Sequence, residues 1–317
     1  MKSNLNKPWY MTLTSVALGI TLPILGLNYV NSNRALAVSQ ASSQTSSKSS
    51  VVSVDKLHSD DKNLIAITER SSTKPTKFWW LHGVSVSQLK SKVNEGYRII
   101  DLEVEKSSPL KFSAAMVKNE GEYGKKWWWY YGLSSQQVKQ KLETNNARII
   151  DLEIYRVNGK KKYAVALVSN TGDDAKGWWY YSDTSINNII EKTKANKARI
   201  VDLDTYVVGG KRLYSAVMIK NKGGDQKAWW YYYNVSPSFI TSKLKDNKAR
   251  LVDIERHGNN KFTVVMEKSQ GQGWWWYYGK TAAQVNQLWQ QNQARIFDIE
   301  PYTVDGKKRF AVLMLKN

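Results

Sequence analysis

One short motif constrains this sequence more than any other feature, because it recurs five times at a nearly constant spacing. The motif consists of an arginine, two apolar residues, an aspartate, another apolar residue and an acid, as in Arg98-Ile-Ile-Asp101-Leu-Glu103. Steps of 50, 51, 51 and 45 residues separate the five arginines, which are Arg98, Arg148, Arg199, Arg250 and Arg295. A period of this length is typical of solenoids, propellers and closed arrays. The fold must therefore place five copies of one structural unit side by side.

Each copy begins with a predicted strand and a predicted helix. An aromatic run such as Trp127–Tyr131, ended by glycine, aspartate or asparagine, predicts a short strand with a turn. A hydroxyl residue then marks each helix start, where it can accept a hydrogen bond from the first turn. These expected N-caps are Ser85, Ser134, Ser185, Ser236 and Thr281. Apolar residues four and eight positions later, such as Val138 and Leu142, predict a narrow stripe that packs on a sheet.

The arginine motif predicts the second strand of each unit. Side chains alternate along a strand, so Arg148, Ile150 and Leu152 are expected on one face. Ile149, Asp151 and Glu153 are then expected on the other face. A hairpin turn such as Asn158-Gly159 leads into a third strand, in which an aromatic residue precedes small and apolar residues.

We therefore predict an α+β repeat protein of five β-α-β-β units of about 50 residues. The repeats cover approximately residues 78–119, 127–170, 178–221, 229–268 and 274–317. Leu64–Thr68 resembles a surplus third strand, which a ring needs for closure or an open array needs as a cap. The whole repeat domain is expected to span 63–317 and to form a propeller-like curved or closed array.

The unit resembles that of a bacterial tandem-repeat family with Trp-Trp-x-Tyr-Tyr, a helix, Ala-Arg-Ile-x-Asp-Leu-Glu and a hairpin in each copy. It is also similar to the structural repeat in the N-terminal domain of polyglycine hydrolases. The resemblance covers about 250 of the 317 residues. In those enzymes a β-lactamase-like domain performs the cleavage, and this sequence contains no such domain. The resemblance therefore implies a fold and a supporting or binding role.

The N-terminus reads as an export signal. Lys2 and Lys7 precede the apolar run Met11–Leu27, and Ala35-Leu36-Ala37 offers a small-x-small cleavage pattern. We predict a signal peptide over 1–37, cleaved after Ala37, and a secreted or periplasmic protein. The alternative is an uncleaved anchor, because the apolar stretch is just long enough to span a bilayer. Residues 38–62, rich in serine, are expected to form a flexible linker.

Composition excludes several kinds of chemistry. The chain contains no cysteine and only 3 scattered histidines, so we expect neither a metal site nor a cysteine nucleophile. Ser87-Gln-Leu-Lys90 matches a β-lactamase signature but lies inside a predicted helix, without its partner motifs. No nucleotide-binding or cofactor-binding motif is present. We predict no catalytic residues and no cofactor.

The repeated acids are the first candidate site. In a closed array they can converge on a common axis, where they suit a cation, a cationic ligand or acid-catalysed hydrolysis. The structural alternative, which we favour, is that each aspartate accepts from an indole N–H or pairs with an arginine of the next repeat. The candidates are Asp101, Asp151, Asp202, Asp253, Asp298, Glu103, Glu153, Asp204, Glu255 and Glu300.

The aromatic residues are the second candidate site. Most of the 14 tryptophans are expected to be core, because both faces of an aromatic strand cannot be exposed. Residues at the strand end vary in type, which favours a wetter rim where rings can stack on sugars or peptides. Tyr131, Tyr233 and Tyr278 are the binding candidates there.

The formal net charge of +20 favours acidic partners. Export makes nucleic acid an unsuitable partner, whereas polysaccharide, a cell-wall polymer or another exported protein fits that compartment. We therefore expect a non-catalytic binding or scaffold module at the cell envelope or outside, without a membrane span after signal cleavage. The alternative is an accessory hydrolase that uses the repeated carboxylates.

Overall fold

The computed structural model describes residues 26–29, 36–39 and 74–317. The predicted signal peptide (1–37), the linker (38–62) and the surplus strand Leu64–Thr68 lie wholly or largely outside these residues and stay predictions. Two short strands, β1 (Gly26–Tyr29) and β2 (Leu36–Ser39), pair antiparallel with each other.

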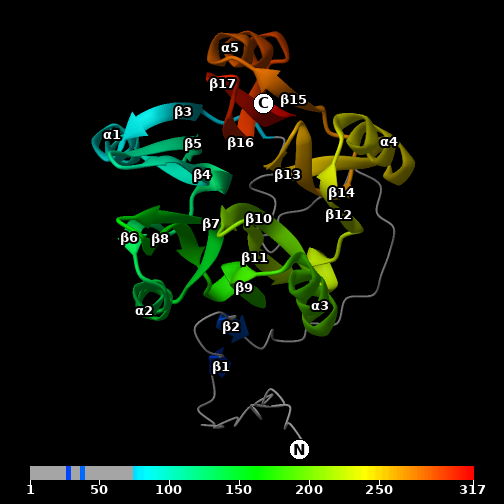
Figure 1. Ribbon diagram of the computed structural model, residues 1–317. Coiled ribbons are helices and arrows are strands. Elements are labelled where there is room, and N and C mark those ends of the chain that lie inside the picture. Colours follow the sequence, from blue (N-terminus) through cyan, green and yellow to red (C-terminus); the bar gives the residue numbers. More distant parts are fainter. Residues whose placement is uncertain (1–25, 30–35, 40–73) are drawn as a thin grey trace, which may run out of the picture.

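Five units follow, and each contains one strand, one helix and two further strands, as the sequence predicts (Figure 1). Unit 1 consists of β3 (Phe78–Ser85), α1 (Val86–Asn94), β4 (Tyr97–Ser107) and β5 (Leu110–Lys118). Unit 2 consists of β6 (Trp127–Leu133), α2 (Ser135–Asn145), β7 (Ala147–Val157) and β8 (Lys160–Ser169). Unit 3 consists of β9 (Trp178–Thr184), α3 (Ile186–Asn196), β10 (Ala198–Val208) and β11 (Lys211–Lys220).

Units 4 and 5 repeat this order. Unit 4 consists of β12 (Trp229–Val235), α4 (Pro237–Asn247), β13 (Ala249–Gly258) and β14 (Lys261–Lys268). Unit 5 consists of β15 (Trp274–Lys280), α5 (Ala282–Gln291), β16 (Ala294–Val304) and β17 (Lys307–Lys316). A short 3-10 helix follows the last strand of each of units 1 to 3. These helices are η2 (Gly121–Tyr123), η3 (Gly172–Asp174) and η4 (Gly223–Asp225).

The third strand of each unit lies in the middle of its sheet, between the aromatic strand and the arginine strand. The order in unit 1 is β3-β5-β4, and both pairings are antiparallel. The other units share this order, and in unit 3 the short strand β2 adds to β9 at the outer edge. The small and apolar residues of the third strand are therefore flanked on both sides and buried.

All five predicted helix caps are confirmed. Ser134, for example, accepts a hydrogen bond from the Gln137 amide, while the Gln137 side chain accepts from the Ser134 amide. The apolar stripe is confirmed as well, since Val138 and Leu142 are buried in the core beneath α2. The helix thus covers one face of its own sheet and leaves its remaining surface to solvent.

The predicted facing of the arginine strand is wrong, because every copy carries a β-bulge within the motif. In unit 2 the register steps from Ile149 opposite Leu167 to Asp151 opposite Ala166, which leaves Ile150 as the extra residue. An inserted residue reverses the alternation beyond it. Arg148, Asp151 and Glu153 therefore share one face, and the same register shift occurs in the other four units.

The five units lie around a common centre, with the helices outside and the arginine strands inside (Figure 1). Each arginine strand contacts the next one along the chain, and β16 of the last unit contacts β4 of the first. Phe112 of unit 1 packs edge-on against Trp129 of unit 2, with ring centroids 5.6 Å apart. Phe310 of unit 5 packs in the same way on Trp80 of unit 1, also at 5.6 Å.

An asparagine clip joins successive units. The Asn221 side chain accepts from the Lys227 amide and donates to the Lys227 carbonyl, at 2.8 and 3.0 Å. Asn119 and Asn170 make the same pair of bonds with the residue six positions later. The last residue, Asn317, makes the pair with Thr76, at 3.0 Å each. The contact between unit 5 and unit 1 thus uses the same groups as the covalently connected junctions.

Candidate functional site

The aspartates of the motif act as latches between units. The Leu102 amide of unit 1 donates to Asp151 of unit 2 at 2.9 Å, and the Leu152 amide donates to Asp202 of unit 3 at 3.2 Å. Asp253 and Asp298 occupy the equivalent strand positions and are also buried. Both are among the sequence candidates. For Asp151 and Asp202 the donor is a backbone amide of the neighbouring unit, whereas the structural alternative named an indole or an arginine.

The arginines of the motif form a second buried column, which the bulge places on the same face as the acids. Arg98 donates to the Asn119 side chain at 3.2 Å and to the Tyr123 carbonyl at 3.3 Å. Arg199 and Arg250 both pair with Glu267 of unit 4. The nearby arginine and lysine charges hold the pKa of Glu267 below its usual range, despite its burial. This column serves the junctions between units.

The second acids of the motif converge at the centre of the array. Oxygens of Glu103, Glu255 and Glu300, from units 1, 4 and 5, all lie within 4.8 Å of one another. Glu153 and Asp204 act electrostatically on members of this group and so belong to the same region. We call these five residues the axial carboxyl cluster. The structure therefore brings together the five acids that the sequence placed in one repeat column.

The five members of the axial carboxyl cluster differ in the hydrogen bonds that they accept. Glu153 accepts from the Val104 amide of the preceding unit at 3.2 Å, and Glu300 accepts from the Arg256 amide at 3.0 Å. Asp204 accepts from the Ile154 amide and from the Ser215 hydroxyl. Among the described residues, neither Glu103 nor Glu255 has a hydrogen-bond donor of this kind. Two carboxyls of the cluster therefore lack the bond that holds the other three.

Burial is the largest cause of a raised pKa at every one of these carboxyls. It raises the pKa of Asp204 to about 7 and that of Glu300 to about 8. The pKa values of Glu103, Glu153 and Glu255 are also raised well above their usual range, because negative charges of neighbouring acids add to the effect. Near neutral pH the cluster consequently retains protons.

The three tyrosines predicted on the aromatic rim differ in exposure. Tyr233 and Tyr278 are 43% and 37% exposed, respectively. Tyr278 packs edge-on against Phe262 of unit 4, and half-buried Tyr131 packs in the same way against Phe112 of unit 1. The rings of Tyr131 and Tyr278 thus lie at junctions between units, and Tyr233 and Tyr278 present part of their surface to solvent. Most tryptophans are at least half-buried, and Trp178 is fully buried.

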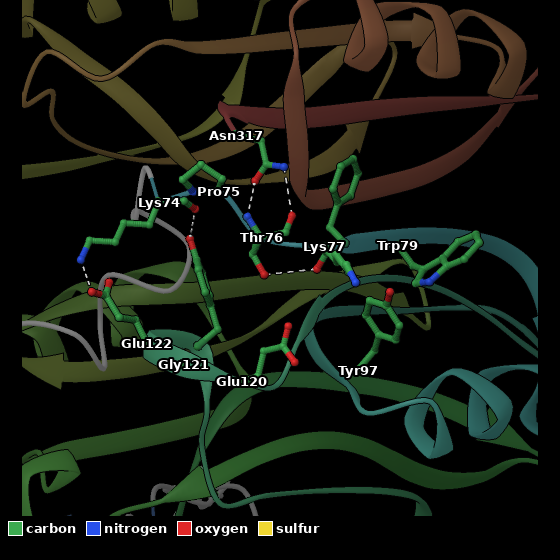
Figure 2. Close-up of a pocket in the computed structure, with 12 residues that line it drawn as sticks. Lys74, Pro75, Thr76, Lys77, Trp79, Tyr97, Glu120, Gly121, Glu122 and Asn317 are labelled. Atoms are coloured by element: carbon green, nitrogen blue, oxygen red, sulfur yellow. Dashed lines mark hydrogen bonds and ion pairs between the residues drawn. The ribbon is translucent and has the colours of Figure 1, made fainter.

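A pocket that the sequence analysis missed lies between the first residues of unit 1, η2 and the C-terminus (Figure 2). Its volume is about 820 Å³, and its walls include Lys74, Lys77, Trp79, Tyr97 and Glu120. Trp79 is 40% exposed and meets Tyr97 edge-on, with centroids 6.3 Å apart. We call this cavity the seam pocket, because Asn317 closes it from the last unit.

The sequence did contain a signal for this pocket. Tyr97 stands directly before the motif arginine, where the other four units have Ala147, Ala198, Ala249 and Ala294. Each of these alanines is buried, whereas Tyr97 is partly exposed and supports Trp79. The other four units fold with alanine at this position, so the shared fold does not require the Tyr97 side chain.

One lysine ammonium lies near each of the two rings of the seam pocket. The Lys92 ammonium lies 4.0 Å from the Trp79 ring centroid, and the Lys118 ammonium lies 5.1 Å from that of Tyr97. Lys74 forms an ion pair with Glu122 at the opposite wall (Figure 2). The pocket walls therefore combine a partly exposed aromatic pair with Lys74 and Lys77 and with the carboxylates of Glu120 and Glu122.

No protein-family model matches this chain, and no characterised protein matches it either. Among the helices of the part that the structure describes, none is both long enough and apolar enough to cross a bilayer. The functional interpretation accordingly depends on the two sites themselves.

Proposed function

We propose that this protein is an exported, non-catalytic binding module that holds an anionic polysaccharide or cell-wall polymer in the seam pocket. The observation that carries this proposal is the pair of Trp79 and Tyr97, half open to solvent beside Lys74, Lys77 and Lys92. Aromatic faces and edges stack on the apolar faces of sugar rings, and ammonium groups pair with carboxylates or phosphates. Export follows from the predicted signal peptide.

The five-unit array serves in this proposal as a rigid frame, closed in the manner of a propeller. The equal 5.6 Å ring contacts at the Phe112–Trp129 and Phe310–Trp80 junctions support closure. So does the clip between Asn317 and Thr76. Closure places the walls of the seam pocket on both ends of the repeat domain, so that a bound polymer would contact unit 1 and unit 5 together.

Affinity electrophoresis of the full chain through gels that contain uronic-acid polysaccharides or teichoic acid tests this function. Wild-type protein is expected to be retarded, and Trp79→Ala is expected to weaken the retardation at least tenfold in apparent Kd. Trp128→Ala is the matched control, because Trp128 holds the same strand position in unit 2 beside Ala147 rather than a tyrosine. Equal retardation of wild type and Trp79→Ala, or none for wild type, contradicts the proposal.

Salt separates the two recognition chemistries. Retention that falls steeply as sodium chloride rises identifies the ammonium groups as the main attraction, because exposed charges are screened within about 8–10 Å at physiological salt. Retention that persists in high salt identifies ring stacking. Both outcomes are compatible with the pocket, and the variant Lys92→Gln assigns the salt-dependent part.

An accessory hydrolase that uses the axial carboxyl cluster is the second candidate. The observation that favours it is the pKa of Asp204, raised to about 7, since a general acid works best near the operating pH. Incubation with glycine-rich peptides and with cell-wall glycans tests it by product release. We expect none, because Glu255 and Glu300 are 9% and 8% exposed and a polymer cannot reach them.

A further inference from the structure

The axial carboxyl cluster contains a subset that differs from the rest in its bonding. Glu255 is 9% exposed and has no hydrogen-bond donor among the described residues, although its carboxylate points at those of Glu103 and Glu300. A carboxylate removed from water without such a donor is unfavourable unless a positive charge or a proton compensates it. Glu255 is therefore compensated either by a bound proton or by a cation that the described residues do not supply.

The reason for the missing donors can be read from the strand register. The amide three residues after the motif aspartate of one unit donates to the second acid of the next, as Val104 does to Glu153. The equivalent residue facing Glu103 is Pro301 of unit 5, which has no N–H to donate. For Glu255 the equivalent amide is that of Thr205, which bonds instead to the carboxylate of Asp204. A proline in unit 5 and a locally bonded amide in unit 3 thus leave Glu103 and Glu255 without this donor.

We propose that Glu103, Glu255 and Glu300 bind a calcium ion at the centre of the array. Calcium takes oxygen ligands at 2.3–2.6 Å, so ligand oxygens on opposite sides of one ion lie roughly 4.6–5.2 Å apart. The three carboxylate oxygens here lie within 4.8 Å of one another and fit that sphere without rearrangement. This inference is independent of the seam pocket and differs from the expectation, drawn from the sequence, that the chain has no metal site.

Other common ions fit these ligands less well. Magnesium needs oxygens at about 2.0–2.1 Å in near-ideal octahedral geometry and gives up its water reluctantly, so it is usually held by one or two carboxylates rather than three. Zinc favours nitrogen and sulfur ligands, and the chain has no cysteine. His82 contacts the Phe310 ring and His257 contacts the Thr263 hydroxyl, so neither imidazole belongs to the group. An all-carboxylate set with water in the remaining positions is typical of calcium.

The surrounding charge also favours a cation. Apart from burial, the strongest effects on the pKa values of Glu103 and Glu255 come from acids, whereas Arg256 offsets part of the negative charge at Glu300. A divalent ion at this point would neutralise several of these repulsions together. Glu103 and Asp204 are partly exposed, so water and ions can reach the cluster.

Isothermal titration calorimetry of the full chain, freed of metal by dialysis against a chelator, tests the site with calcium chloride and magnesium chloride as probes. We expect one saturable calcium site, with calcium bound at least tenfold more tightly than magnesium. Glu255→Gln removes a charged ligand and is expected to weaken calcium binding at least tenfold. The metal-free variant should melt at the same temperature as wild type or higher, because a repulsive charge is lost.

The matched control is Glu143→Gln, which alters an exposed glutamate on α2 that forms an ion pair with Lys139. It should bind calcium as wild type does. Glu103→Gln provides a second test at the cluster if Glu255→Gln does not fold. The proposal is overturned if wild type shows no saturable binding up to about 10 mM calcium, beyond the weakest extracellular sites. It is equally overturned if both cluster variants bind calcium as tightly as wild type.

Discussion

Asp101 of the first unit accepts a 2.9 Å hydrogen bond from the backbone amide of Ile299 in the last unit, 198 residues further along the chain. The same bond joins Leu102 to Asp151 between two consecutive units, also at 2.9 Å. A junction without covalent connection thus repeats the geometry of a connected one. The stability of the folded protein should depend on this equivalence and on the charges that it brings together.

The two aspartate latches should be worth similar amounts. Asp101→Ala and Asp151→Ala each leave a buried backbone amide without its acceptor, which costs about 1–3 kcal/mol of the free energy of unfolding. Urea denaturation at pH 7 measures both variants against wild type. If Asp151→Ala has the full cost and Asp101→Ala changes the free energy by less than about 0.5 kcal/mol, the array is open in solution.

The C-terminal asparagine should stabilise the junction between the ends. Asn317→Ala removes both bonds to Thr76 and is expected to lower the free energy of unfolding by about 1–3 kcal/mol. Hydrogen exchange should accelerate most at the Thr76 amide. Asn221→Ala, at an internal junction, is the matched variant, and its faster exchange should appear at Lys227 instead. Protection at Thr76 that survives Asn317→Ala would contradict this role of the clip.

Small residues of the third strand should be required for contact between units. Ala166 is fully buried in the cluster that also contains Phe112 and Met116 of unit 1. Ala166→Leu is expected to destabilise the protein by about 1–3 kcal/mol, because extra methylenes force neighbouring side chains from their positions. Ala283→Leu, on the exposed surface of α5, should change stability by no more than about 0.5 kcal/mol. Differential scanning calorimetry distinguishes the two variants.

Stability in the absence of metal should fall as the pH rises. The axial carboxyls have raised pKa values in the folded protein, so the fold binds more protons than the unfolded chain does. Their contribution is fully present below about pH 4, where the unfolded carboxyls also hold protons. It is lost as the pH rises through about 7 for Asp204 and about 8 for Glu300.

Urea denaturation in a chelator at pH 5 and pH 8.5 measures this loss. The titrating groups are Glu103, Glu153, Asp204, Glu255 and Glu300, and the charges of Asp101, Asp151, Asp202, Asp253 and Arg256 act on them. Glu300→Gln should flatten the dependence, because one titrating group is removed. A wild-type stability that rises between these two pH values would refute the interpretation.

Local sequence features predicted the parts of each unit well. Hydroxyl caps such as Ser134, the stripe of Val138 and Leu142, and the Asn158-Gly159 turn depend on contacts within a few residues, and all three appear where expected. The bulge at Ile150 was missed, because strict alternation is the default for a strand and the sequence carries no glycine or proline there. That single extra residue decides whether arginine and acid share a face.

The sequence by itself determined that five similar units exist, which elements each contains and which acids occupy equivalent positions, because all of these follow from local periodicity and repetition. Only the tertiary structure decided what the acids do. The aspartates became latches, and three of the second acids came within 4.8 Å of one another. The structural consequence of Pro301 depends on the contact between unit 5 and unit 1. That of Tyr97 depends on its position beside Trp79 in the seam pocket. Distances between residues about 200 positions apart depend on how all five units pack together. No local sequence pattern encodes that combined arrangement.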